Sequence, residues 1–322
     1  MVNKFGCFVI SLDFELFWGV RDRRTINDYG DNILGAREVI PEMVNLFSKY
    51  NVKATFATVG LLYCKNKEEI NQYTPVLKPT YNNSFLSPFE NNYLDSVDDN
   101  NDIYHSAFDI IEGLKQENHI EIASHTFSHF YCWEAGQNLK QFESDVESSI
   151  HVFSSNHITL KSIVFPRNQV PDHYLNTCIR YGINTYRGNP IKYFNKGNKT
   201  KNRLLRLIDT FINFGNDTTY TYNEVKEGKF YNVRASRYLR PFSQKYKFLA
   251  KLKIRRIKNE MNVAAKQNKI YHLWWHPHNF GINKCENLSM LEEILFHFQY
   301  LSIKYNFKSF TMKEMSGLVN YK

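Results

Sequence analysis

The alternation of strand-like and helix-like segments restricts the possible folds of this sequence more than any other feature. Runs of β-branched and aromatic residues predict strands, and segments with apolar residues at helical spacing lie between them. We expect strands at residues 5–13, 52–60, 119–125 and 160–166, and another at the start of 269–281. Strands and helices that alternate in this way form a parallel sheet, and the simplest such fold for this chain is a (β/α) barrel.

Polar residues follow several of these strands. Asp13, His125, Arg167 and His276 each lie at or just beyond the end of a predicted strand. In a barrel of parallel strands these ends meet on one face, where active sites are assembled from separate loops. We therefore expect the four side chains to contribute to one site.

A single segment carries the whole excess of positive charge. Residues 191–270 contain 20 Lys and Arg against 5 Asp and Glu, a balance of +15, whereas the complete chain of 322 residues has a net charge of +9. We interpret residues 1–322 as one barrel domain with a basic insertion at about 191–270.

The composition of this insertion predicts an anionic partner. Arg234, Arg237 and Arg240 are candidates for binding a phosphate-bearing substrate, an acidic polysaccharide or a membrane surface. The apolar positions from Phe248 to Ile257 are expected to lie against the barrel or against lipid headgroups. The alternative is a solvated basic helix with no partner. We recognise no nucleic-acid-binding module, so nucleic acid is not an expected partner.

Two further features predict where the protein is located. We recognise no signal peptide and no apolar stretch long enough to cross a membrane. The five cysteines are scattered, without CxxC spacing, which is typical of reduced thiols rather than of a disulfide framework. We therefore expect a cytoplasmic protein, with membrane association only through the basic insertion.

Two histidines form the first candidate metal site. His125 and His129 are separated by three residues, directly after a predicted strand. Histidines at this spacing can face the same side of a helical turn and chelate one metal ion through their imidazoles. The spacing alone is common, but its position at a strand end favours a metal site.

A pair of carboxylates ends the first predicted strand. Asp13 and Glu15 are two residues apart, and side chains at this spacing on a strand point to the same face. One carboxylate can complete a metal site with the two histidines, and the other can accept a proton from water. The alternative is a pair that caps a helix or forms salt bridges at the start of a loop.

Two more residues are candidates for catalysis. Arg167 is expected to hold a substrate carboxylate, or Asp13, from the mouth of the barrel. His276 follows a strand and lies beside two tryptophans, and it is a candidate general acid because the pKa of histidine is easily moved across neutrality. An ordinary surface arginine and a packed structural histidine are the alternatives.

Aromatic residues make up 16% of the chain, which is unusually frequent. Flat apolar rings suit the faces of pyranose sugars, so part of this excess is a candidate lining for a sugar-binding groove. We predict that Trp18, Trp275 and His278 contact the substrate.

Taken in order, these motifs resemble those of the polysaccharide deacetylases of carbohydrate esterase family four, over roughly residues 5–190 and 269–315. The resemblance rests on SLDFE, KATFATVG, EIASHTFSH, FPRNQVP and LWWHPH, of which EIASHTFSH is the most specific. It implies a distorted (β/α)7 barrel with a bound divalent metal ion, usually zinc. By the same resemblance, Asp13 is the catalytic base, His125 and His129 are metal ligands, and His276 is the catalytic acid.

Two departures from the family pattern affect individual residues. The family usually has two adjacent Asp in its first motif, but here the second position is Phe14. Either Glu15 replaces the metal carboxylate, or Asp13 binds the metal itself. The arginine motif is FPRNQ rather than Arg-Pro-Pro, which affects the role of Arg167. These departures resemble a branch of the family found in bacterial lipopolysaccharide and O-antigen synthesis.

The predicted function is metal-dependent removal of an N-acetyl group from an amino sugar of a bacterial surface glycan or of its nucleotide- or lipid-linked precursor. A deformylase or another amidase would use the same residues. A glycan-binding relative that has lost catalysis is the alternative from a different functional class.

Overall fold

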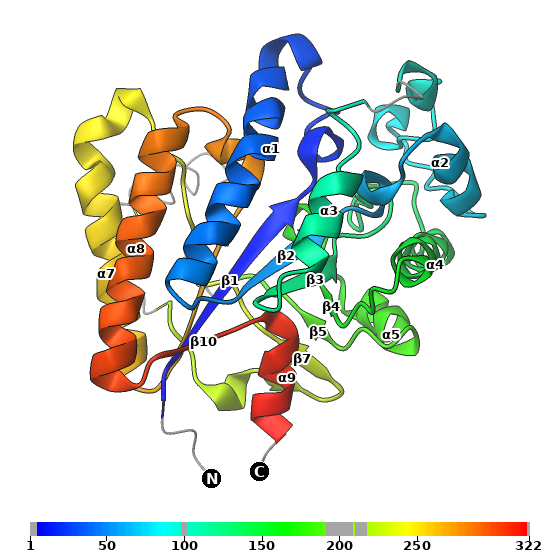
Figure 1. Cartoon of the computed structure of the whole chain (residues 1–322). Helices are drawn as coiled ribbons and strands as arrows, with labels where there is room; N and C mark the ends of the chain where they lie inside the picture. The colour runs from blue at the N-terminus through cyan, green and yellow to red at the C-terminus, as the bar shows by residue number, and fades with distance from the viewer. Residues whose placement is uncertain (1–4, 98–101, 191–208, 210–217, 321–322) are drawn as a thin grey trace.

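The protein is built around one sheet of parallel strands, as a computed structural model of the chain shows for residues 5–97, 102–190, 209 and 218–320 (Figure 1). The strands are β1 (Cys7–Phe14), β2 (Ala54–Thr58), β3 (Ile120–Ser124), β4 (Ser162–Ile163), β5 (Thr185–Tyr186), β6 (Lys226–Glu227), β7 (Phe230–Asn232), β8 (Arg237–Tyr238), β9 (Ile270–Trp275) and β10 (Lys308–Phe310). Their order is β6-β7-β5-β4-β3-β2-β1-β9-β8, with β10 paired to the start of β1. Within this sheet β6 alone runs antiparallel to its neighbour.

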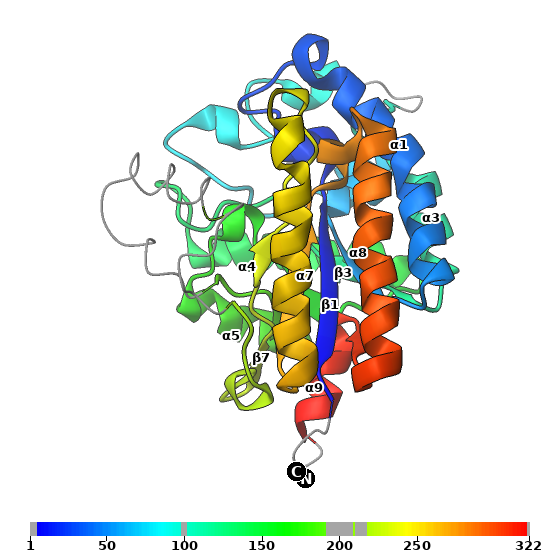
Figure 2. The same ribbon diagram turned by 90° about the vertical axis from the view of Figure 1, so that its left-hand side faces the viewer.

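Helices cover the outside of the sheet. They are α1 (Ile26–Lys49), α2 (Lys67–Tyr73), α3 (Phe108–Lys115), α4 (Leu139–Ser155), α5 (Asp172–Arg180), α7 (Ala250–Lys266), α8 (Lys284–Tyr305) and α9 (Met312–Asn320). Helices α7 and α8 stand side by side over β1 (Figure 2). Helix α1 begins at Ile26, where Thr25 and Asp28 form a capping box. Among the described residues, no helix combines the length and the apolar character that a membrane span requires.

The segment that contains β7 and β8 closes the curved sheet. The Val233 N–H donates to the Tyr186 carbonyl at the end of β5, at 2.9 Å, and the Leu239 N–H donates to the Trp274 carbonyl in β9, at 2.8 Å. One short segment therefore bridges the two ends of the sheet, which confirms the predicted distorted barrel.

Most of the predicted basic insertion lies within this architecture. Residues 191–208 and 210–217 lie outside the described residues. The rest of the segment supplies β6, β7, β8 and α7, and β8 pairs directly with β9. This part is therefore integral to the barrel, although its charge sets it apart in the sequence.

Side chains along β1 point alternately towards the helices and towards the interior of the barrel, where the site lies. Phe8, Ile10 and Leu12 are fully buried against the helices, whereas Cys7 and Val9 belong to a second cluster inside the barrel. Helix α9 closes the bottom of that cluster with methionines that include Met315 (Figure 1). Because side chains on a strand alternate, Ser11 and Asp13 continue the interior row towards the open end of the barrel.

Candidate metal and catalytic site

Asp13 and Glu15 lie at the end of β1, and both side chains are buried. Phe14 lies between them and points into the core, where its ring packs edge-on against Phe56. Glu15 also begins the short helical turn Leu16–Gly19, which folds back over it. A Cβ atom added at Gly19 would lie 2.0 Å from the Glu15 carboxyl carbon, so the turn leaves room for this carboxylate only with glycine at that position.

The loop after β3 presents His125 and His129, but not on the helical turn that their spacing predicted. Thr126 and His129 have φ angles of +63° and +59°, so the chain turns through left-handed conformations instead. The buried Asp145 of α4 stabilises this turn, since its carboxylate accepts the N–H of Phe127 at 2.7 Å. Burial raises the pKa of Asp145 to about 6.

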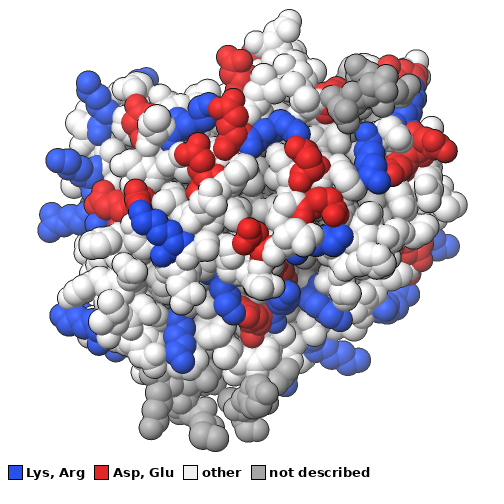
Figure 3. All heavy atoms as spheres, viewed as in Figure 1, with Lys and Arg blue, Asp and Glu red and all other residues white. Residues whose placement is uncertain are grey.

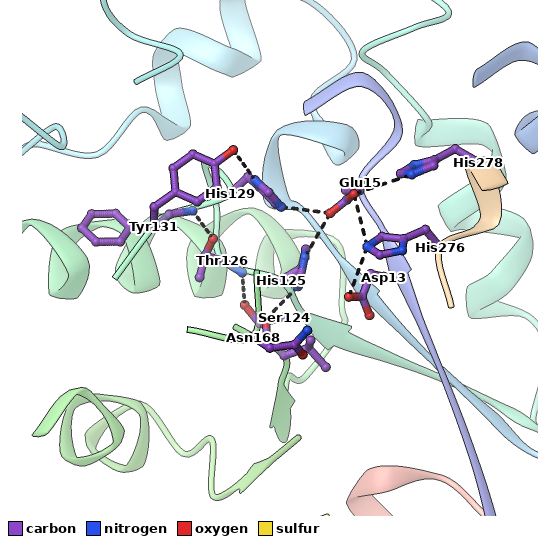
Figure 4. Close-up of polar contacts among 12 residues, drawn as sticks. Asp13, Glu15, Ser124, His125, Thr126, His129, Tyr131, Asn168, His276 and His278 are labelled. Carbon is purple, nitrogen blue, oxygen red and sulfur yellow. Dashed lines mark hydrogen bonds and ion pairs between the residues drawn. The ribbon is translucent and has the colours of Figure 1, made fainter. Parts of the chain in front are cut away.

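Glu15, His125 and His129 form the group of described residues that could hold a metal ion, with ligand atoms that all lie within 4.8 Å of one another. Glu15 Oε2 lies 2.9 Å from His129 Nε2 and 3.3 Å from His125 Nε2 (Figure 4). The opposite ring nitrogens are anchored, with His125 Nδ1 2.7 Å from the Val164 carbonyl and His129 Nδ1 3.1 Å from the Tyr131 hydroxyl. Such outer contacts orient metal-ligating histidines.

The protonation states of this group suit a cation. Burial lowers the pKa of His129, although the neighbouring Glu15 opposes this effect, so the imidazole keeps a free lone pair at neutral pH. Burial alone would raise the pKa of Glu15, but His276 and His129 hold it well below its usual value. Neutral imidazoles and an ionised carboxylate are the donors that a divalent ion such as zinc accepts, so these residues fit a metal site.

Asp13 lies outside the metal group and has a different partner. The fully buried Arg187 contacts it through two parallel hydrogen bonds, from Nη1 to Oδ1 at 2.6 Å and from Nη2 to Oδ2 at 2.7 Å. Burial raises the pKa of Asp13, but the charge and hydrogen bonds of Arg187, together with the nearby His276 and His125, outweigh this and the net shift is downwards. Asp13 is therefore an ionised carboxylate with a fixed orientation.

Arg187 was missed in the sequence, where Arg167 was expected to hold either a substrate carboxylate or Asp13. Arg167 instead donates to Asp22 and, at 3.2 Å, to Glu134, and its guanidinium lies over the Tyr131 ring. The expected contact with Asp13 is wrong, because the left-handed turn at Arg167 directs its side chain to the wall of the cleft. Arg187 directly follows β5, and that position at a strand end was the signal available in the sequence.

His276 and His278 approach the two carboxylates from the loop after β9. His276 Nε2 lies 3.7 Å from Asp13 Oδ2 and 3.6 Å from Glu15 Oε1 (Figure 4). Its side chain is 23% exposed, whereas His278 is buried behind it and stacks against its ring. Burial, together with the charge of His276, lowers the pKa of His278 to about 3. His276 is thus the histidine of this pair that a ligand in the cleft can reach.

Trp18 and Trp275 are core residues, so the predicted substrate contacts of these two side chains are wrong. Trp18 is 1% exposed and donates its indole N–H to the His105 carbonyl at 2.7 Å. Trp275 is completely buried and stacks on Phe280. Alternation along β9 explains this, because Trp274 faces the barrel interior and lies over Arg187.

The predicted anion-binding arginines do not line the cleft either. Arg237 is buried, and it forms two hydrogen bonds of 2.6 Å with Glu260 of α7. Arg234 pairs with Glu224 at 2.6 Å. Arg240 borders a separate hollow between the end of β8 and the start of α7. A direct role for Arg237 in binding substrate is therefore wrong, because a carboxylate from its own segment neutralises it.

The candidate catalytic residues share one open cleft of about 390 Å³. It is lined by Asp13, Glu15, Gly19, Val20, Arg23, Arg24, Tyr29, His129, Arg167, Asn168, Tyr238, His276, His278 and Asn279. Arg23 and Arg24 are 67% and 53% exposed, and each has a loose ion pair, of 3.4 Å with Asp22 and 3.6 Å with Asp28. The cleft therefore combines buried acid–base and metal-ligating groups with a cationic rim.

Comparison with known proteins relates both the sequence and the fold to one family. The model of the polysaccharide deacetylase family matches residues 26–186, which is half of the chain. No curated protein matches the chain.

The fold is similar to that of a Mycobacterium smegmatis protein described as a polysaccharide deacetylase. The TM-score is 0.61 at 12% identity, over 98% of this chain and 91% of that one. A Pseudomonas aeruginosa PAO1 protein described as a probable polysaccharide deacetylase and the Puue allantoinase each give a TM-score of 0.54 at 10% identity, over 97% of this chain and 89% of theirs. At these identities the likeness concerns the fold alone.

Proposed function

The chain belongs to the polysaccharide deacetylase family, and from this premise we propose that it is a metal-dependent hydrolase that removes the N-acetyl group from an amino sugar. One observation carries the proposal: a two-histidine, one-carboxylate group lies in the same cleft as a separate, ionised carboxylate. Hydrolysis of an amide with a metal requires both parts, since one holds the ion and the other accepts a proton.

Glu15, His125 and His129 are the proposed metal ligands. Two neutral imidazoles and one carboxylate are a donor set of catalytic zinc sites, which leave a coordination position open, so we propose zinc as the ion. When bound, the ion would supply a Lewis acid beside the acetamide of the substrate. The anchored Nδ1 atoms of both histidines support this assignment, because they direct the Nε2 atoms towards Glu15.

Asp13 is the proposed general base and His276 the proposed general acid. Asp13 accepts a proton from the attacking water, whose oxygen bonds to the acetyl carbon, while Arg187 keeps the carboxylate ionised and oriented. The C–N bond then breaks, and protonated His276 gives its proton to the departing amine. The products are acetate and a free amino sugar. The partial exposure of His276 and its 3.7 Å distance from Asp13 support this division of roles.

The rim of the cleft suggests a charged substrate. Arg23 and Arg24 line the cleft, and neither guanidinium donates a hydrogen bond to another described residue. Guanidinium groups with free donors bind phosphate and carboxylate groups well. We therefore place phosphate recognition at these two residues rather than at Arg237, and expect a phosphate-bearing sugar such as a nucleotide- or lipid-linked precursor of a surface glycan.

The experiment that tests the proposed function is acetate release by the zinc-loaded protein. Its substrates are a neutral N-acetylglucosamine oligosaccharide and a nucleotide-linked N-acetylamino sugar, and Asp13→Asn is the control. We expect acetate from the wild-type protein, with faster turnover of the phosphate-bearing sugar, and none above background from the variant. Release of formate from an N-formyl sugar instead would identify a deformylase. Binding of either glycan with no hydrolysis would contradict the proposal and favour a binding protein.

A further inference from the structure

Seven residues beside the cleft form a surface that is both basic and apolar. They lie on the short helical segment η8 (Gln244–Leu249) and on the first turns of α7, and we call them the basic–apolar patch. The patch consists of Lys245, Tyr246, Lys247, Phe248, Lys251, Leu252 and Arg255. Residues 228–259 contain no acidic side chain, so the segment itself provides no charge that neutralises these cations.

The apolar side chains of the patch are displayed to solvent. Phe248 is 73% exposed, Leu252 42% and Tyr246 38%. Phe248, Lys251, Leu252 and Arg255 recur at helical spacing on one face, and the four basic residues form no ion pair with any described residue. Lys and Arg side chains also project from the edge of the molecule along which α7 runs (Figure 3). Large exposed apolar side chains among unpaired cations are typical of helices that bind membrane surfaces.

The opposite face of the same helix holds the patch in place. Ile254, Ile257 and Met261 are buried in the core, so the apolar residues of this segment divide between the barrel and solvent. Lys253 is also buried, and its ammonium donates to the carbonyls of Arg240 and Pro241, at 2.7 and 3.1 Å. The α7 part of the patch therefore lies on a helix that is anchored to the barrel and does not need to fold when it binds.

The patch lies on the face of the barrel that carries the site. Strand β8 runs parallel to β9, so the chain that leaves β8 emerges at the same end of the sheet as His276. Tyr238, the last residue of β8, lines the cleft and accepts a hydrogen bond of 2.7 Å from Asn279. The start of α7 and the loop after β1 both lie at the upper end of the molecule in Figure 2.

We propose that the basic–apolar patch docks the protein on a negatively charged lipid surface, with the mouth of the cleft next to that surface. Cations attract the anionic headgroups, and Phe248 and Leu252 enter the interface between headgroups and acyl chains. Docking would bring the cleft to substrates held at a membrane. Docking on a membrane does not require catalysis, so the docking proposal can be tested independently of the deacetylase activity.

The test is sedimentation of the full chain with phosphatidylcholine vesicles that contain or lack phosphatidylglycerol. We expect binding only to the anionic vesicles, weakened by salt. Each lysine near such a surface contributes about 1 kcal/mol, so Lys247→Ala with Lys251→Ala should lower the partition coefficient about 30-fold. Phe248→Ser alone should also reduce it. Acetate release from a water-soluble substrate should stay unchanged in both variants, which shows that they are folded.

The matched control removes two lysines from the other end of the barrel. Lys226 and Lys229 are exposed at the hairpin before β7, and their replacement by Ala makes the same change in net charge. This pair should bind vesicles as the wild-type protein does. Absence of wild-type binding to anionic vesicles, an equal loss in the control pair, or retention on an acidic polysaccharide without vesicle binding would each overturn the proposal.

Discussion

Asp13 and Glu15 are only two residues apart, yet their surroundings prepare them for different chemistry. Arg187 contacts both oxygens of Asp13 and fixes its orientation, whereas Glu15 directs one oxygen between two histidine nitrogens. The carboxylate with a permanent cation as partner is the one suited to act as a base. Glu15 faces two histidines rather than an arginine, and a metal ion would complete its surroundings.

Gly19 provides a residue-scale test of the metal site. In Gly19→Ala the added Cβ would meet the Glu15 carboxylate at 2.0–2.5 Å, so this side chain must move away from the histidines. We expect zinc affinity to fall at least about tenfold while the fold persists, because the displaced group is a flexible side chain. Isothermal titration with zinc measures this. Gly113→Ala, where the new Cβ meets nothing within 4 Å, should bind zinc normally, and an equal loss there would refute the explanation.

Arg187 provides a test of the catalytic carboxylate. Arg187→Lys keeps the positive charge but cannot form the two parallel hydrogen bonds to Asp13. We expect kcat to fall by about 10- to 100-fold, whereas zinc affinity should remain unchanged because Arg187 contacts no proposed ligand. Steady-state kinetics and a zinc titration on the same preparation separate the two effects. A parallel loss of zinc would indicate that Arg187 supports the metal site instead.

At the scale of elements, the ion pair between Arg237 of β8 and Glu260 of α7 helps to hold this helix against the barrel. Arg237→Ala would remove two hydrogen bonds from the buried Glu260, which keeps Arg256 at 3.1 Å and the Tyr271 hydroxyl at 2.9 Å, and we expect a loss of about 2–3 kcal/mol of unfolding free energy. Arg234→Ala removes a pair whose carboxylate is 45% exposed and should cost less than about 1 kcal/mol. Urea denaturation compares the two. Similar small losses, together with weaker substrate binding in Arg237→Ala, would restore a substrate-binding role.

Lys253 makes the stability of the same region depend on pH. Burial, with the nearby charge of Arg240, lowers its pKa from 10.5 to about 8. Between these values the unfolded chain binds the proton and the folded chain does not, so unfolding free energy rises with pH across this window. Relative to Lys253→Met, the wild-type protein should gain up to roughly 3 kcal/mol from pH 8 to pH 10.5. Denaturation of both proteins at several pH values checks this, and a constant difference would show that Lys253 is charged in the fold throughout.

For the whole molecule, the residues that follow long strands were predictable and those that depend on distant partners were not. Asp13 lies at the end of β1, and His125 and His276 directly follow strands of five and six residues, so the local pattern located them. Arg187 follows a strand of only two residues, so its position at a strand end was a much weaker signal in the sequence. Arg237 was misinterpreted because its partner, Glu260, lies 23 residues away on another element.

The same distinction applies to the tryptophans and to the barrel as a whole. The alternation of strands and helices predicted the parallel barrel, since that signal repeats along the chain. The alternation did not predict whether Trp274 or Trp275 faces the interior of the barrel. This depends on the register of β9 against β1, where Trp275 lies opposite Leu12. Register is a property of the assembled sheet.

The division of roles between Glu15 and Asp13 is the central claim, and zinc binding to two isosteric variants tests it most directly. Glu15→Gln and Asp13→Asn each replace a buried carboxylate by an amide of the same shape. Isothermal titration should show zinc affinity reduced by more than about 100-fold in Glu15→Gln and retained in Asp13→Asn. Loss of zinc in Asp13→Asn with retention in Glu15→Gln would contradict the account and assign the metal to Asp13.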